Sequence, residues 1–84
     1  MVEIRPLTGA WTGDKFMIVG TFGRPQEKGG RFAMIHSWEK IGDERPVIKK
    51  LVDTQPMSHD QALDWAKKYA TDNNFPVIYE SAFD

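Results

Sequence analysis

Two stretches, KFMIVGTF at 15–22 and RFAMIHSW at 31–38, decide the fold expected of this chain. Successive side chains of a β-strand point to opposite faces, so the first stretch puts Phe16 and Ile18 on one face and Met17 on the other. An antiparallel strand with one solvated face normally alternates apolar and polar residues. Both stretches are apolar on both sides, and we therefore predict strands that need cover on two faces.

The second stretch and the segment before it supply the residues of a predicted binding surface. One face of the stretch carries, in order, Phe32, Met34, His36 and Trp38. The preceding segment at 23–31 is polar and rich in glycine, and it contains Arg24, Lys28 and Arg31. Loops of this length and composition often carry function. We predict that the aromatic face and this flap form one surface, and two possibilities stay open for the flap: an anion cradle or a solvated hairpin tip.

The amino-acid composition limits the classes of protein to which this chain can belong. With 40% apolar and 27% charged residues, the 84 residues are expected to form one small globular domain, residues 1–84. The net charge of -1 shows neither the basic excess of a duplex-binding domain nor the acidic excess of a nucleic-acid mimic. No cysteine is present, so disulfides and thiolate ligands are excluded. The first residues do not resemble a signal peptide and no long apolar run occurs, so we expect a cytoplasmic protein without membrane contact.

One helix is expected at about 59–72. Ser58 and Gln61 have the spacing of a capping box, in which each side chain bonds the backbone amide of the other residue. Apolar residues then recur at three- and four-residue spacing. The pair Asn73-Asn74 can supply the left-handed conformation that ends a helix, and Pro76 prevents the helix from continuing.

Three further strands complete the expected fold, at 2–5, 47–52 and 76–80. The pattern predicts the α+β class: an antiparallel β-meander of about four strands, with the helix packed on one face and a short C-terminal strand. Such a helix is roughly 21 Å long and covers about half of one face of such a sheet. The other face is expected to be covered either by a partner or by strong curling of the sheet on itself.

The two histidines do not predict a catalytic or metal site. His36 is expected to be a partly exposed sheet residue, and His59 an exposed residue of the first helical turn. A metal needs three or four converging ligands, and a nucleophile needs a base held by a third group. No spacing in the chain predicts such a set, so neither a cofactor nor an enzyme is expected.

The favoured function is a non-enzymatic protein-interaction module. It is expected to be a homodimer or a small regulator or inhibitor of a larger macromolecule, of the kind found among accessory and mobile-element proteins. One alternative is single-stranded nucleic-acid binding on the aromatic sheet face, which the net charge does not favour. A small enzyme is the third and least favoured hypothesis.

Overall fold

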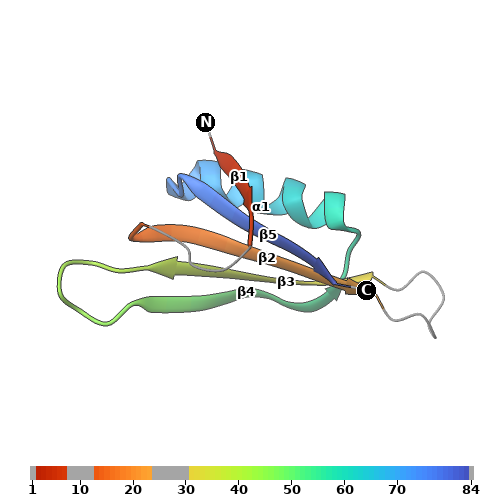
Figure 1. Cartoon of the computed structure of the whole chain (residues 1–84), viewed down its shortest axis with the longest axis horizontal. Helices are drawn as coiled ribbons and strands as arrows, with labels where there is room; N and C mark the ends of the chain where they lie inside the picture. Colours follow the sequence, from red (N-terminus) through yellow and green to blue (C-terminus); the bar gives the residue numbers. More distant parts are fainter. Residues whose placement is uncertain (1, 8–12, 24–30, 84) are drawn as a thin grey trace.

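The computed structural model describes residues 2–7, 13–23 and 31–83, and it forms one sheet with one helix (Figure 1). The elements are, in chain order, β1 (Glu3–Pro6), β2 (Lys15–Gly23), β3 (Arg31–Glu39), β4 (Val47–Pro56), α1 (His59–Asn73) and β5 (Val77–Phe83). The strand order across the sheet is β1-β5-β2-β3-β4. The predicted α+β class, with one helix and a final strand, is confirmed.

The strand order differs from a purely antiparallel meander. The pairs β2–β3 and β3–β4 are antiparallel, as predicted. However, β5 lies inside the sheet between β1 and β2 and pairs parallel with both (Figure 1). A parallel strand is usually buried and continuously apolar, and the run Val77, Ile78 and Tyr79 at the start of β5 has this character.

The ends of α1 form as the sequence predicts. The Ser58 hydroxyl accepts a hydrogen bond from the Gln61 amide at 3.1 Å, and the Gln61 side chain accepts one from the Ser58 amide at 3.0 Å. Asn74 ends the helix in the left-handed conformation, with φ 61° and ψ 42°. Both caps satisfy backbone groups that a helix end otherwise leaves without partners.

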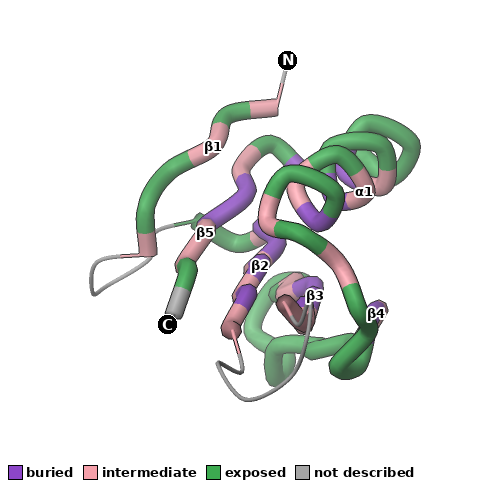
Figure 2. Tube along the Cα trace, turned by 90° about the vertical axis from the view of Figure 1, so that its right-hand side faces the viewer, coloured by how far each residue is buried: buried purple, intermediate pink, exposed green. Residues whose placement is uncertain are grey.

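The core lies between α1 and one face of the sheet (Figure 2). The buried face of α1 is made of Ala62, Ala66 and Ala70, whose short side chains let the helix approach the strands closely. On the sheet side the core consists of Met17, Val19, Ala33, Ile35, Val52 and Ile78, with Phe75 at its end. Of the two faces of β3, the one with Ala33 and Ile35 therefore lies under the helix.

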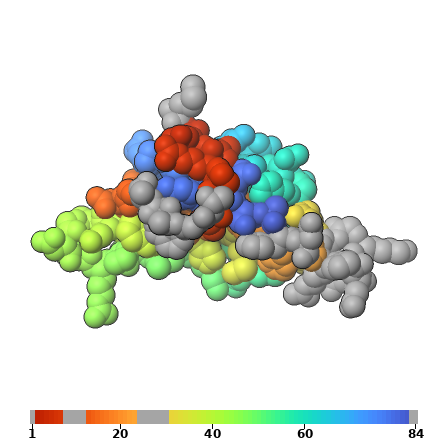
Figure 3. Space-filling model, viewed as in Figure 1, coloured from red at the N-terminus to blue at the C-terminus, as the bar shows by residue number. Residues whose placement is uncertain are grey.

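The edge strand β4 lies outside the cover of the helix, since α1 contacts β2, β3 and β5. Most of its residues are exposed, Val47 and Ile48 included. Two register shifts interrupt its pairing with β3, and Thr54 has a positive φ of 52° beside one of them. The end of the β3–β4 hairpin, yellow-green in Figure 3, extends beyond the helix. β4 is longer than the predicted strand 47–52 because it continues through these bulges.

Candidate functional site

The sheet face turned away from α1 gathers aromatic and apolar side chains, and we call it the aromatic face. It consists of Phe16, Ile18, Gly20 and Phe22 of β2, Phe32, Met34, His36 and Trp38 of β3, Ile48 and Lys50 of β4, Tyr79 and Ser81 of β5, and Arg5 of β1. The four predicted residues of β3 thus lie together, and each is half-buried. Phe16 and Tyr79 are buried.

Aromatic rings on this face pair across neighbouring strands. The Phe16 ring stacks on Trp38 with 4.9 Å between centroids, and it meets Tyr79 edge-on at 5.3 Å. A second pair, Phe22 and Phe32, has centroids 6.0 Å apart. Such pairs add stability beyond their buried area, roughly 0.5–1.5 kcal/mol each. Trp38 is therefore fixed by Phe16 on one side while part of its surface remains exposed.

A row of residues in register crosses the aromatic face and carries its charges. The row runs Arg5, Tyr79, Ile18, His36 and Lys50 from β1 to β4. Both cations have acidic neighbours on their own strands: Arg5 bonds Glu3 at 2.9 Å, and Lys50 lies 3.8 Å from Asp53. The hydrogen bond from Arg5 lowers the pKa of Glu3, and the same bond raises the pKa of Arg5. The charges at the two margins of the face are thus compensated.

Gly20 leaves a gap near the centre of the aromatic face. It lies in register with Met34 on β3 and with Ser81 on β5. A Cβ atom at Gly20 would meet only the Met34 carbonyl oxygen, at 4.0 Å. A side chain from another molecule can therefore approach the backbone of the central strand here.

The predicted flap does not join the aromatic face in the part of the chain that the structure describes. Arg24 and Lys28 lie outside the described residues. Arg31 begins β3, and the alternation of the strand places it on the helix side, opposite in register to Gly23. Among the described residues, the structure therefore brings together Phe32, Met34, His36 and Trp38 and places Arg31 on the other face of β3.

His59 has a role that sequence reasoning missed. Its Nδ1 atom is hydrogen bonded to the Thr21 hydroxyl at 2.6 Å, and its Nε2 atom lies 3.5 Å from a Glu80 carboxylate oxygen. The imidazole bridges β2 and β5 from the first turn of α1, with 22% of its side chain exposed. The expectation of an exposed first-turn histidine is wrong, because the capping box turns this position toward the sheet.

The hydroxyl, imidazole and carboxylate follow the order of a nucleophile, a base and an orienting group. Thr21, however, is 0% exposed, so no substrate carbonyl can reach its oxygen. The three residues are better understood as a hydrogen-bonded contact that joins α1 to the sheet. No signal in the sequence pointed to it, because Thr21 occupies an apolar position of its strand and the three residues lie far apart in the chain.

Other kinds of site receive no support from the described residues. They contain no group of three or more acidic or histidine side chains that could hold a metal ion. None of their helices is long and apolar enough to cross a bilayer. Comparison of the chain with protein-family models, with curated proteins and with solved structures found no match.

Proposed function

We propose that this protein is a non-enzymatic protein-interaction module that pairs with a second copy of itself through the aromatic face. The observation that carries the proposal is that α1, the one helix among the described residues, packs on the face with Ala33 and Ile35 and leaves the opposite face to other contacts. The half-buried apolar side chains of the opposite face form a contiguous surface. Patches of this kind on a folded domain usually mark an interface.

The two edge strands of the sheet are poorly suited to pairing with a strand of another molecule. Contact through the aromatic face is therefore favoured. Two bulges and the adjacent Lys49 and Lys50 interrupt β4, and both features discourage edge pairing. At the other edge, β1 has four residues and ends at Pro6, which lacks an amide donor. Packing of two aromatic faces, about 10 Å apart, would instead give a sandwich of two sheets.

The size of the aromatic face suits a weak dimer. Five strands about 4.8 Å apart and up to ten residues long give a face of roughly 600 Å². A stable complex of standard size buries about 800 Å² on each partner, and smaller interfaces are typically transient. We therefore expect a dimer whose population rises with concentration.

Charge favours a protein partner over a single-stranded nucleic acid. Phosphate binding requires uncompensated Lys and Arg side chains, because counterion release supplies most of the affinity. On the described part of the aromatic face, Arg5 and Lys50 each have a carboxylate neighbour. The ring pairs also already cover part of the surfaces on which bases would stack.

The proposal is tested by light scattering on the full chain over a range of concentrations. Ile48 and Ile41 are both 63% exposed, but Ile48 lies on the aromatic face beside Trp38, whereas Ile41 lies in the turn after β3. We expect the wild type and Ile41→Glu to dimerise alike. Ile48→Glu should remain a monomer, because it buries an unpaired charge at the interface. Neither substitution removes a buried contact, so both variants should fold.

A wild-type protein that stays monomeric at the highest concentration would contradict self-association. An equal effect of the two glutamates would also contradict it, because it would reflect net charge alone. The nucleic-acid alternative has its own readout, since an oligonucleotide stacked on Trp38 should quench tryptophan fluorescence at low salt.

A further inference from the structure

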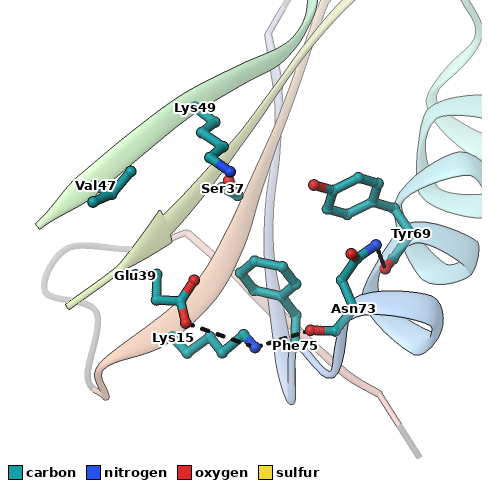
Figure 4. Close-up of a pocket in the computed structure, with 8 residues that line it drawn as sticks. All are labelled: Lys15, Ser37, Glu39, Val47, Lys49, Tyr69, Asn73 and Phe75. Atoms are coloured by element: carbon teal, nitrogen blue, oxygen red, sulfur yellow. Dashed lines mark hydrogen bonds and ion pairs between the residues drawn. The ribbon is translucent and has the colours of Figure 1, made fainter. Parts of the chain in front are cut away.

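On the helix side of the sheet, a cleft of about 200 Å³ opens between the C-terminal end of α1 and the ends of β3 and β4 (Figure 4). It exists because α1 contacts β2, β3 and β5 and leaves β4 uncovered. Its polar side chains come from four elements: Lys15 of β2, Ser37 and Glu39 of β3, Lys49 of β4, and Tyr69 and Asn73 of α1. The ring of Phe75 forms an apolar wall.

Ser37 points its hydroxyl into this cleft without a partner. The residue is only 4% exposed, and no hydrogen bond to its hydroxyl is formed within the described part of the chain. Yet no described side chain has a polar atom that is both sealed from solvent and without a hydrogen bond. Part of the remaining exposure of Ser37 therefore lies at its oxygen, and the residue lines the cleft. A nearly buried hydroxyl that has no hydrogen-bond partner in the protein is a typical feature of a binding pocket.

Two more donors converge on the same space. Lys49 is the register partner of Ser37 on the neighbouring strand, and both residues line the cleft (Figure 4). The Tyr69 hydroxyl points toward both from α1 (Figure 4). Its ring is fixed by stacking on Trp65 at 5.5 Å. Neither Lys49 nor the Tyr69 hydroxyl has an ionic or hydrogen-bonding partner among the described residues.

The other lysine of the cleft is already engaged. Lys15 donates a hydrogen bond to the Asn73 carbonyl at 2.9 Å and lies 3.8 Å from the Glu39 carboxylate. Its ammonium group also sits 4.8 Å from the centre of the Phe75 ring. Lys15 thus neutralises Glu39 and the negative end of the α1 dipole. The charge of Lys49 is left uncompensated.

We infer that this cleft binds a small organic carboxylate, held by Lys49, Ser37 and Tyr69. One ammonium and two hydroxyl groups match the acceptors of a carboxylate. A single uncompensated positive charge suits a monoanion better than a phosphate dianion. The volume of about 200 Å³ lies below the roughly 300–1,000 Å³ of pockets for larger ligands, so only a short molecule fits. The cleft lies on the other side of the sheet from the aromatic face and does not depend on the proposed dimer.

The test is an amide NMR titration of the full chain with sodium propionate, in parallel with sodium phosphate and sodium chloride at equal ionic strength. Propionate should give saturable shifts at Ser37 and Lys49. Lys49→Gln should weaken propionate binding by about tenfold or more, because it removes the uncompensated charge among the described residues that line the cleft. Lys67→Gln is the matched control: it removes the same charge from the exposed side of α1, outside the lining of the cleft, and binding should stay within about twofold.

Three results would overturn the inference. The first is the absence of saturable shifts with propionate, and the second is tighter binding of phosphate than of propionate. The third is an equal loss in the two lysine variants, which would indicate only a general response to charge. Lys49 and Lys67 are both exposed and neither supports the core, so the spectra should report binding in a folded protein.

Discussion

At the scale of single residues, Thr21 shows how a polar group is accommodated in the core of the sheet. It follows Met17 and Val19 on the helix side of β2 and is fully buried. Its hydroxyl forms a hydrogen bond with the His59 ring at 2.6 Å, which gives Thr21 a partner and holds the imidazole over the sheet. A buried polar group is costly unless it is hydrogen bonded, so the contact orients α1 as well as satisfying Thr21.

We predict that Thr21→Val destabilises the protein by about 1–2 kcal/mol in urea unfolding, because the shape is kept but the imidazole loses its partner. Thr71→Val is the matched control. Its hydroxyl bonds the Lys67 carbonyl on the exposed side of α1, so its loss should change stability by less than about 0.5 kcal/mol. Equal stability of Thr21→Val and the wild type would show that the contact contributes nothing.

The residues of the candidate surfaces were predictable to different degrees. Alternation alone placed Phe32, Met34, His36 and Trp38 on one face, because period-two patterning is a property of any strand. The cleft around Ser37 was not predictable, since it depends on which strand the helix leaves uncovered. The environment of His59 was missed for a similar reason: the cap was recognised, but the strand beneath it was unknown.

At the scale of elements, β2 is the strand that joins the parallel and antiparallel parts of the sheet. It pairs with β5 on one side and β3 on the other, and it contains Gly20 in its interior. Glycine weakens a strand interior because it loses more conformational freedom on folding than other residues do. Gly20 does not have the positive φ that would require glycine.

We predict that Gly20→Ala raises stability by about 0.4–1 kcal/mol, because the new methyl group has room and the unfolded chain loses freedom. Gly42→Ala provides the contrast. Gly42 lies in the turn between β3 and β4 with a φ of +61°, which alanine adopts only with strain. Thermal unfolding should therefore shift in opposite directions, and a decrease for Gly20→Ala would mean that β2 needs glycine for another reason.

The sequence predicted the elements better than their order. The capping box and Asn74 located α1 to within a residue, because helix caps are local signals. The place of β5 was missed because strand pairing joins residues far apart in the chain, such as Met17 and Ile78. The crossover through α1 carries the chain from the β4 edge to the other side of β2, and no local pattern encodes that path.

At the scale of the whole molecule, the structure is a sheet with α1 packed on one face and with aromatic side chains paired across neighbouring strands on the other. The helix buries small alanines against one face, while aromatic pairs such as Phe16 and Trp38 fill part of the other. If two copies join through the aromatic face, association and folding are linked, because only the folded chain presents that surface.

We therefore predict that the midpoint of thermal unfolding rises with protein concentration for the wild type. Ile48→Glu should abolish this dependence, because a monomer unfolds at a temperature independent of concentration. Scanning calorimetry at two concentrations at least tenfold apart provides the measurement. A concentration-independent midpoint in the wild type would speak against the dimer independently of light scattering.

The interior position of β5 also has a consequence for synthesis on the ribosome. β1 has a single neighbour in the sheet, β5, although the paired residues Glu3 and Val77 are 74 positions apart in the chain. The hairpins of β2, β3 and β4 can form as soon as they emerge, but β1 must wait until residues 77–83 have been translated. At a translation rate of roughly 5–20 residues per second, β1 therefore has no strand to pair with for several seconds. During that interval it is open to capture by chaperones.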